Sequence, residues 1–114
     1  MIKFYLPFPP SVNGLYSGKA RRHKSANYVA WIEKANESLN KQIIPDMLER
    51  CHVVYNLNHP DNRIRDAENY CKAATDLIAD RGIIQGDDRR YLKSTKAEWN
   101  DIKGDLVEVC LIPV

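Results

Sequence analysis

Alternating apolar and polar residues predict several strands along this chain. Residues 2–6 form a β-branched and aromatic run that a proline stops, which is typical of an opening strand. Every second residue from Cys51 to Leu57 is apolar, a period of two that predicts another strand. The same alternation over residues 106–112 predicts a strand near the C-terminal end, and residues 91–99 are a weaker strand candidate.

Apolar residues with helical spacing predict a first helix between Ser25 and Pro45. Ser25 offers an N-cap, and the proline ends the pattern. The expected apolar face comprises Tyr28, Trp31, Ile32, Ala35, Leu39 and Ile43.

A second helix is predicted from Asp66 or Ala67 to Arg81, where Gly82 supplies a C-terminal stop. Its expected apolar face comprises Ala67, Tyr70, Cys71, Ala74, Leu77 and Ile78. The order strand, helix, strand, helix, strand, strand predicts an α/β or α+β fold, with two main helices packed on a small mixed β-sheet. The length favours one domain over residues 1–114.

The net charge of +2, from 17 Lys and Arg against 15 Asp and Glu, does not by itself indicate a nucleic-acid partner. The positions of the charges matter more, because acidic and basic residues gather around the same stretch. The basic residues gather at Lys19, Arg21, Arg22, Lys24, Arg63, Arg65, Arg89 and Arg90. The acidic residues gather at Asp66, Glu68, Asp76, Asp80, Asp87 and Asp88.

Three cysteines without CxxC spacing argue against a disulfide framework and against a zinc ribbon. No run approaches the roughly 18 apolar residues of a membrane helix, and Pro7 interrupts the N-terminal apolar run before it resembles a signal sequence. We therefore expect a cytoplasmic protein with no membrane partner.

Two loops offer recognition chemistry. Residues 7–13 contain three prolines and form a stiff loop, so Ser11 and Asn13 are held more accurately than in a flexible segment. The alternative is a plain turn at the strand exit. Residues 15–24 are either a solvated loop or a basic arm that tracks phosphates through Lys19, Arg21, Arg22 and Lys24.

The stretch from Arg65 to Lys72 concentrates charge at the start of the second predicted helix. Residues two apart on a helix point about 200° away from each other, so Asp66 and Glu68 converge only if Asp66 lies outside the helix. The alternative is that Asp66 simply caps the helix. Lys72 lies four residues after Glu68, which fits either an ordinary ion pair or a positive charge directed at a phosphate.

Asp87 and Asp88 follow the second predicted helix in a turn. A turn there brings one of them back beside Asp66 and Glu68. Three carboxylates suit Mg²⁺, or Mn²⁺ as a substitute, because both are hard cations that prefer oxygen ligands.

Three motifs in order resemble the RusA family of Holliday junction resolvases: Pro7-Phe8-Pro9-Pro10-Ser11-Val12-Asn13, Arg65-Asp66-Ala67-Glu68-Asn69-Tyr70-Cys71-Lys72 and Gly82 to Arg89. The resemblance implies a RusA-like fold and a homodimeric, Mg²⁺-dependent endonuclease that nicks four-way DNA junctions symmetrically in recombination and repair. Proteins of this kind are common in phages and prophages.

The resemblance also implies roles for single residues. Metal ligation falls on Asp66, Glu68 and Asp88, with Asp87 as the alternate to Asp88, and the essential lysine falls on Lys72. DNA contacts are expected from Arg65 and Asn13, and from Lys72 and the basic arm. The second aspartate of the family pattern is a glutamate here, so a DNA-binding protein of this fold with weakened or lost catalysis is an alternative. A further alternative is an interaction module whose charged stretch is only surface.

Overall fold

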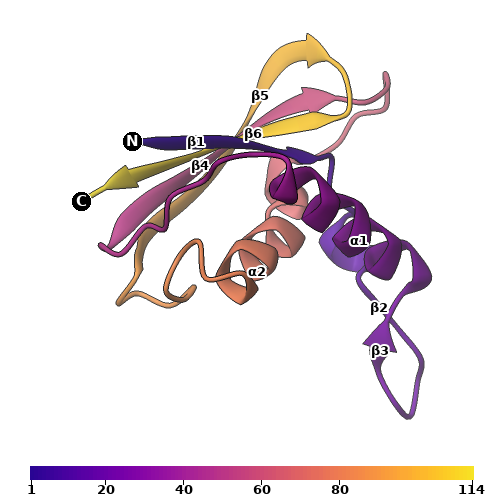
Figure 1. The fold of residues 1–114 in the computed structure, drawn as a ribbon. Helices are drawn as coiled ribbons and strands as arrows, with labels where there is room; N and C mark the ends of the chain where they lie inside the picture. Colours follow the sequence, from indigo (N-terminus) through magenta and orange to yellow (C-terminus); the bar gives the residue numbers. More distant parts are fainter.

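A four-stranded mixed sheet forms the centre of the molecule (Figure 1), with the strand order β1-β6-β4-β5. The computed structural model describes residues 1–114. The strands are β1 (Ile2–Pro7), β4 (Cys51–His59), β5 (Leu92–Lys103) and β6 (Leu106–Pro113). β6 runs antiparallel to both β1 and β4, whereas β4 and β5 are parallel. The predicted mixed fold with both helices and strands is confirmed.

Two α-helices, α1 (Ala26–Asn40) and α2 (Lys72–Asp80), lie on one face of this sheet. A short hairpin of β2 (Tyr16–Ser17) and β3 (His23–Lys24) precedes α1. Two 3₁₀ helices, η1 (Val12–Gly14) and η2 (Ala67–Tyr70), complete the fold.

The first helix begins as predicted, because the Ser25 hydroxyl accepts a hydrogen bond from the Tyr28 backbone N–H at 3.2 Å. Its core face is buried at Tyr28, Trp31, Ala35 and Leu39. Ile43 was wrongly assigned to this face. The helix ends at Asn40, so Ile43 lies beyond its last turn and is fully exposed.

The second predicted helix is divided. Asp66 has extended backbone angles, the 3₁₀ helix η2 follows it, and α2 begins only at Lys72. Tyr70 contacts Phe8 and Trp99 on neighbouring segments, with ring centroids 5.0 and 6.4 Å away. We attribute the division to this tertiary packing, which overrides the modest helix propensity of Asn69, Tyr70 and Cys71.

The strand β4 carries the core. Its alternating residues Cys51, Val53, Tyr55 and Leu57 have no exposed surface, which confirms the predicted period of two. The Tyr55 hydroxyl is buried but satisfied, because it lies 2.7 Å from Oγ1 of Thr75 on α2. This hydrogen bond ties the sheet to the helix in the interior.

The two edges of the sheet differ. The Gln42 side chain pairs with the outer edge of β1, accepting a hydrogen bond from Tyr5 N at 2.9 Å and donating one to Tyr5 O at 2.8 Å. Trp31 Nε1 donates to the carbonyl of Pro7 at 3.0 Å. These side chains occupy the positions that an additional strand would need, whereas the β5 edge carries Lys93, Lys96 and Lys103, which discourage such pairing.

None of the helices in this structure is long and apolar enough to cross a membrane.

The buried bond between Tyr55 and Thr75 gives a testable prediction. Tyr55→Phe and Thr75→Val each leave one buried hydroxyl without a partner, so each should lower the free energy of unfolding by about 1–3 kcal/mol. The double variant should lose less than the sum of the two, because neither hydroxyl then remains. Denaturant unfolding measures all three variants, and strictly additive losses would contradict the proposed coupling.

Candidate functional site

An aromatic cluster of Phe8, Tyr70 and Trp99 brings the proline loop, the charged stretch and β5 together. Phe8 lies 5.0 Å from Tyr70 and stacks on Trp99 at 6.2 Å between ring centroids. The stiff loop at residues 7–13 is therefore held against the segment that carries the candidate carboxylates.

Asp66 and Glu68 line one hollow of about 500 Å³, here called the acidic hollow. Its lining residues are Arg65, Asp66, Ala67, Glu68, Asn69, Ala97 and Trp99. Asp66 stands outside the helical turn with φ −89° and ψ 123°, and Glu68 lies within it, as the spacing predicted. The Asp66 side chain makes no capping hydrogen bond to the 3₁₀ helix. Neither carboxylate takes part in a hydrogen bond or an ion pair within the chain, so both remain available to a ligand.

Arg65 stands at the rim of the acidic hollow and is fixed by Asp61. The two side chains form a bidentate pair, with Nη2 of Arg65 2.8 Å from Oδ2 of Asp61. Asp61 also accepts hydrogen bonds from the backbone N–H and from Nε of Arg63, at 2.9 and 3.1 Å. The Arg65 guanidinium, followed by Arg63, holds the pKa of the Asp61 carboxyl well below its ordinary range. Asp61 thus fixes the position of the Arg65 side chain, which lines the same hollow as Asp66.

Arg65 also lines a second hollow of about 370 Å³, here called the loop hollow. Its lining residues are Phe8, Pro9, Pro10, Ser11, Gly14, Asn27, Arg63, Arg65 and Tyr70. Arg65 is the residue shared by the acidic hollow and the loop hollow. Asn13 is exposed beside this loop hollow in η1, where Ser11 Oγ accepts its backbone N–H at 3.3 Å.

Lys72 is the first residue of α2 and pairs with Asp76, 3.1 Å away, rather than with Glu68. The ion pair with Glu68, one of the two alternatives that the spacing allowed, does not form, because Glu68 belongs to the separate 3₁₀ turn. The hydrogen bond that Lys72 donates to Asp76 is the main reason that the pKa of Lys72 is raised, so the amine stays charged. The side chain remains half exposed.

Asp87 lies in a third hollow, here called the helix hollow, of about 260 Å³. Its lining residues are Tyr16, Lys24, Tyr28, Asp76, Ala79, Asp80 and Asp87. Burial, and then the nearby Asp76, raise the pKa of Tyr28 to about 12. The helix hollow shares no residue with the acidic hollow, so Asp87 does not line the same hollow as Asp66 and Glu68.

Asp88 is engaged by Arg90. Its Oδ1 accepts hydrogen bonds from the backbone N–H and Nε of Arg90, both at 2.9 Å, and its Oδ2 lies 2.8 Å from Nη2. These bonds lower the pKa of Asp88 to about 2. The predicted meeting of Asp88 with Asp66 and Glu68 is not seen in this structure.

Of the predicted metal ligands, only Asp66 and Glu68 line the same hollow. No three His, Cys, Asp or Glu side chains lie close enough together to hold an ion. Asp66 and Glu68 nevertheless fit Mg²⁺ by their chemistry, since this ion is commonly bound through one or two carboxylates, with waters and substrate phosphates as the other ligands.

The basic arm is the β2–β3 hairpin, which extends away from the sheet in Figure 1. Lys19, Arg21 and Arg22 are exposed in its turn, and Lys24 lies in β3 at the helix hollow. Gly18 has φ +93°, and a Cβ there would be 2.3 Å from the Arg21 carbonyl oxygen. A glycine is therefore needed for the turn that presents these charges.

No protein family and no curated protein matched this sequence.

Sequence reasoning missed Asp61, Asp76 and Asp80 as members of these sites. Asp76 and Asp80 follow Lys72 at intervals of four residues, a spacing that places all three on one helical face. Asp61 precedes Arg65 by four residues but lies in a loop, where spacing carries no such information.

The Asp61 pair gives a pH prediction. The pKa of Asp61 is lower in the folded chain than the ordinary carboxyl pKa near 4. The ion pairs of Asp61 therefore order this loop fully above about pH 4, and the order is lost as the pH falls through the lower pKa of the folded chain. Hydrogen exchange of the Arg63 amide should therefore gain protection with rising pH at the acid end, after correction for intrinsic exchange. Asp61→Asn should remove this dependence. Asp46→Asn, at an exposed residue without an ion pair, is the control, and an unchanged profile in Asp61→Asn would contradict the assignment.

Proposed function

We propose that this chain is a metal-dependent endonuclease of branched DNA that nicks four-way junctions as a homodimer. The observation that carries the proposal is the acidic hollow, where Asp66 and Glu68 lie together with no partner within the chain. Arg65 and the proline loop adjoin it. Free carboxylates beside fixed arginines suit a phosphodiester, because the metal ligands and the phosphate contacts are both supplied.

In this proposal Asp66 and Glu68 hold Mg²⁺. When bound, the ion would supply a water of lowered pKa and neutralise charge on the scissile phosphate. Arg65 positions the strand, since its guanidinium cannot turn freely while Asp61 holds it. Ser11 and Asn13 offer polar contacts from the loop that Phe8 fixes on Trp99.

Lys72 is suited to stabilising negative charge at the leaving oxygen. It is half exposed at the N-terminus of α2, a helix of nine residues. The unpaired backbone N–H groups of a helix start add to this positive potential. Asp76 keeps the amine protonated, so Lys72 acts as a charge rather than as a base.

A symmetric junction calls for two equivalent active sites, and therefore for a two-fold dimer. The β2–β3 hairpin of each protomer would then contact a DNA arm through Lys19, Arg21 and Arg22. These contacts carry no sequence information, because they reach phosphates rather than bases.

A binding protein without cleavage is the second candidate. Two observations favour it: Asp88 is engaged by Arg90, and Asp87 lines a different hollow. Glu68 also stands where the family pattern has aspartate. Such a protein would retain the phosphate contacts of the loop and the arm.

Nicking of labelled four-way junctions with and without Mg²⁺ separates the two candidates. For the enzyme, Asp66→Asn, Glu68→Gln and Lys72→Ala should each lower the cleavage rate by at least about 100-fold, the size expected when one transition-state contact is lost. Junction binding should survive in all three variants. Glu33→Gln, at an exposed residue of α1, is the control. Binding without nicking at any Mg²⁺ or Mn²⁺ concentration would establish the second candidate.

The basic arm predicts a salt dependence. Replacing Arg21 and Arg22 together by Gln should reduce the slope of log binding constant against log salt by about 2, because each phosphate contact contributes about one unit. Fluorescence anisotropy with a labelled junction measures the slope. The matched control is Lys34→Gln with Lys41→Gln, which replaces an exposed residue of α1 and the exposed residue that follows its last turn. Equal changes in both pairs would contradict a specific role for the arm.

A further inference from the structure

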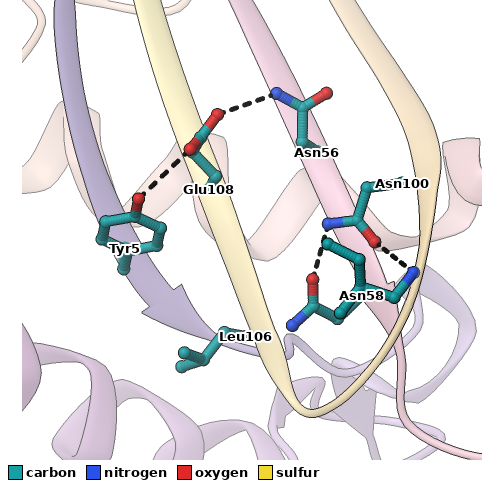
Figure 2. Close-up of a pocket in the computed structure, with 7 residues that line it drawn as sticks. Tyr5, Asn56, Asn58, Asn100, Leu106 and Glu108 are labelled. Atoms are coloured by element: carbon teal, nitrogen blue, oxygen red, sulfur yellow. Dashed lines mark hydrogen bonds between the residues drawn. The ribbon is translucent and has the colours of Figure 1, made fainter.

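The sheet face opposite the helices bears a polar hollow that no role above uses. Figure 2 shows this outer hollow, of about 470 Å³, formed on β1, β4, β5 and β6. Its lining residues are Tyr5, Asn56, Asn58, Asn100, Ile102, Leu106 and Glu108. It is distinct from the acidic hollow, with which it shares no residue.

Glu108 is held in place at one side of the outer hollow. The Tyr5 hydroxyl donates to its Oε2 at 3.2 Å, and Nδ2 of Asn56 donates to its Oε1 at 3.2 Å. The Cys110 thiol also donates to Oε1, at 3.4 Å. The thiol, and then Asn56 and Tyr5, lower the pKa of Glu108, so the carboxylate is charged at neutral pH. Oε2 retains capacity to accept another hydrogen bond, whereas Oε1 already accepts two.

Asn58 and Asn100 are fixed at the other side. Nδ2 of Asn100 donates to Oδ1 of Asn58, and Oδ1 of Asn100 accepts the backbone N–H of Ile102 at 2.9 Å. Gly104 makes room for this pair, since a Cβ there would be 2.8 Å from Nδ2 of Asn58. Two groups remain without a partner within the chain: Oδ1 of Asn56 and Nδ2 of Asn58. The outer hollow therefore offers acceptors and a donor in fixed positions.

The chemistry of the lining limits the ligand. No Lys, Arg or His lines the outer hollow, and its one charged group is the Glu108 carboxylate, so phosphate-bearing ligands are disfavoured. Hydroxyl groups both donate and accept hydrogen bonds, which suits a lining that mixes the two. Leu106 and Ile102 are exposed by 45% and 59% and offer an apolar surface to the C–H groups of a ring.

We propose that the outer hollow binds a neutral polyhydroxylated ligand, that is, a small saccharide. Glu108 and Oδ1 of Asn56 accept from adjacent sugar hydroxyls, and Nδ2 of Asn58 donates to another. Because the polar side chains are already held by one another, little rotamer entropy is lost on binding. The site is independent of the proposed nuclease activity, and either can fail without the other.

An NMR titration of the full chain with glucose, galactose and maltose tests the proposal. The side-chain amide signals of Asn56, Asn58 and Asn100 should shift and saturate with a Kd on the order of 1 mM, the weak end of the affinity scale. Adenosine, cytidine and inorganic phosphate, titrated separately, should leave these signals unchanged. Shifts of equal size with a nucleoside or with phosphate would overturn the saccharide assignment, as would no shift with any of the sugars.

Variants distinguish a binding site from residues that only tie the strands together. Glu108→Gln and Asn58→Ala should each weaken sugar binding about tenfold or more, the effect of losing one hydrogen bond to a charged or well-placed group. Gly104→Ala should weaken it as well, by displacing the Asn58 amide. Lys96→Gln, on β5 outside the hollow, is the control. Thermal unfolding verifies that each variant is folded, and unchanged sugar binding in folded Glu108→Gln and Asn58→Ala would overturn the site.

Discussion

The contact among Phe8, Tyr70 and Trp99 determines most of what surrounds the candidate active site. These rings come from the proline loop, from η2 and from β5, and they lie within 6.4 Å of one another. Aromatic pairs of this kind contribute about 0.5–1.5 kcal/mol each beyond the area that they bury. With Tyr70 fixed among them, the chain from Asp66 to Tyr70 makes a short 3₁₀ turn instead of extending α2, and Glu68 is separated from Lys72.

Because of this separation, Lys72 pairs with Asp76 rather than with Glu68. Asp61, Asp76 and Asp88 each pair with a cation two or four residues away. Exposed pairs of this type contribute little stability. They nevertheless leave neither the carboxylate nor the cation free for another partner. Asp66 and Glu68 have no such partner, although Arg65 is adjacent in sequence, because Asp61 holds its guanidinium. The two carboxylates that line the acidic hollow are therefore free of ion pairs within the chain.

The sequence predicted the strands well and the site geometry only in part. The period of two in β4 identified its buried residues, since one face of a strand must be apolar, and the Ser25 cap located the start of α1. The single helix predicted from Asp66 or Ala67 to Arg81 was wrong in its continuity, because η2 and α2 are separate. We attribute the break to the contacts of Tyr70 with Phe8 and Trp99, which spacing along the chain does not reveal. The position of Asp87 and Asp88 depends on a turn and on the Arg90 side chain, and neither follows from spacing.

The two faces of the sheet show how one alternating pattern can produce two kinds of surface. In the second half of β4, the residues that alternate with the core are Asn56 and Asn58, and the period of two identifies them only as polar. Their pairing with Glu108 on β6 and Asn100 on β5 crosses three strands, so it exists only once the sheet has formed with this register. On a solvated face such pairing contributes only about 0.5–1.5 kcal/mol for each hydrogen bond, because it replaces a hydrogen bond to water. Because these amides are fixed and leave Oδ1 of Asn56 and Nδ2 of Asn58 unused, the proposed saccharide would find its hydrogen-bonding partners in place, whether or not the proposed nuclease activity exists.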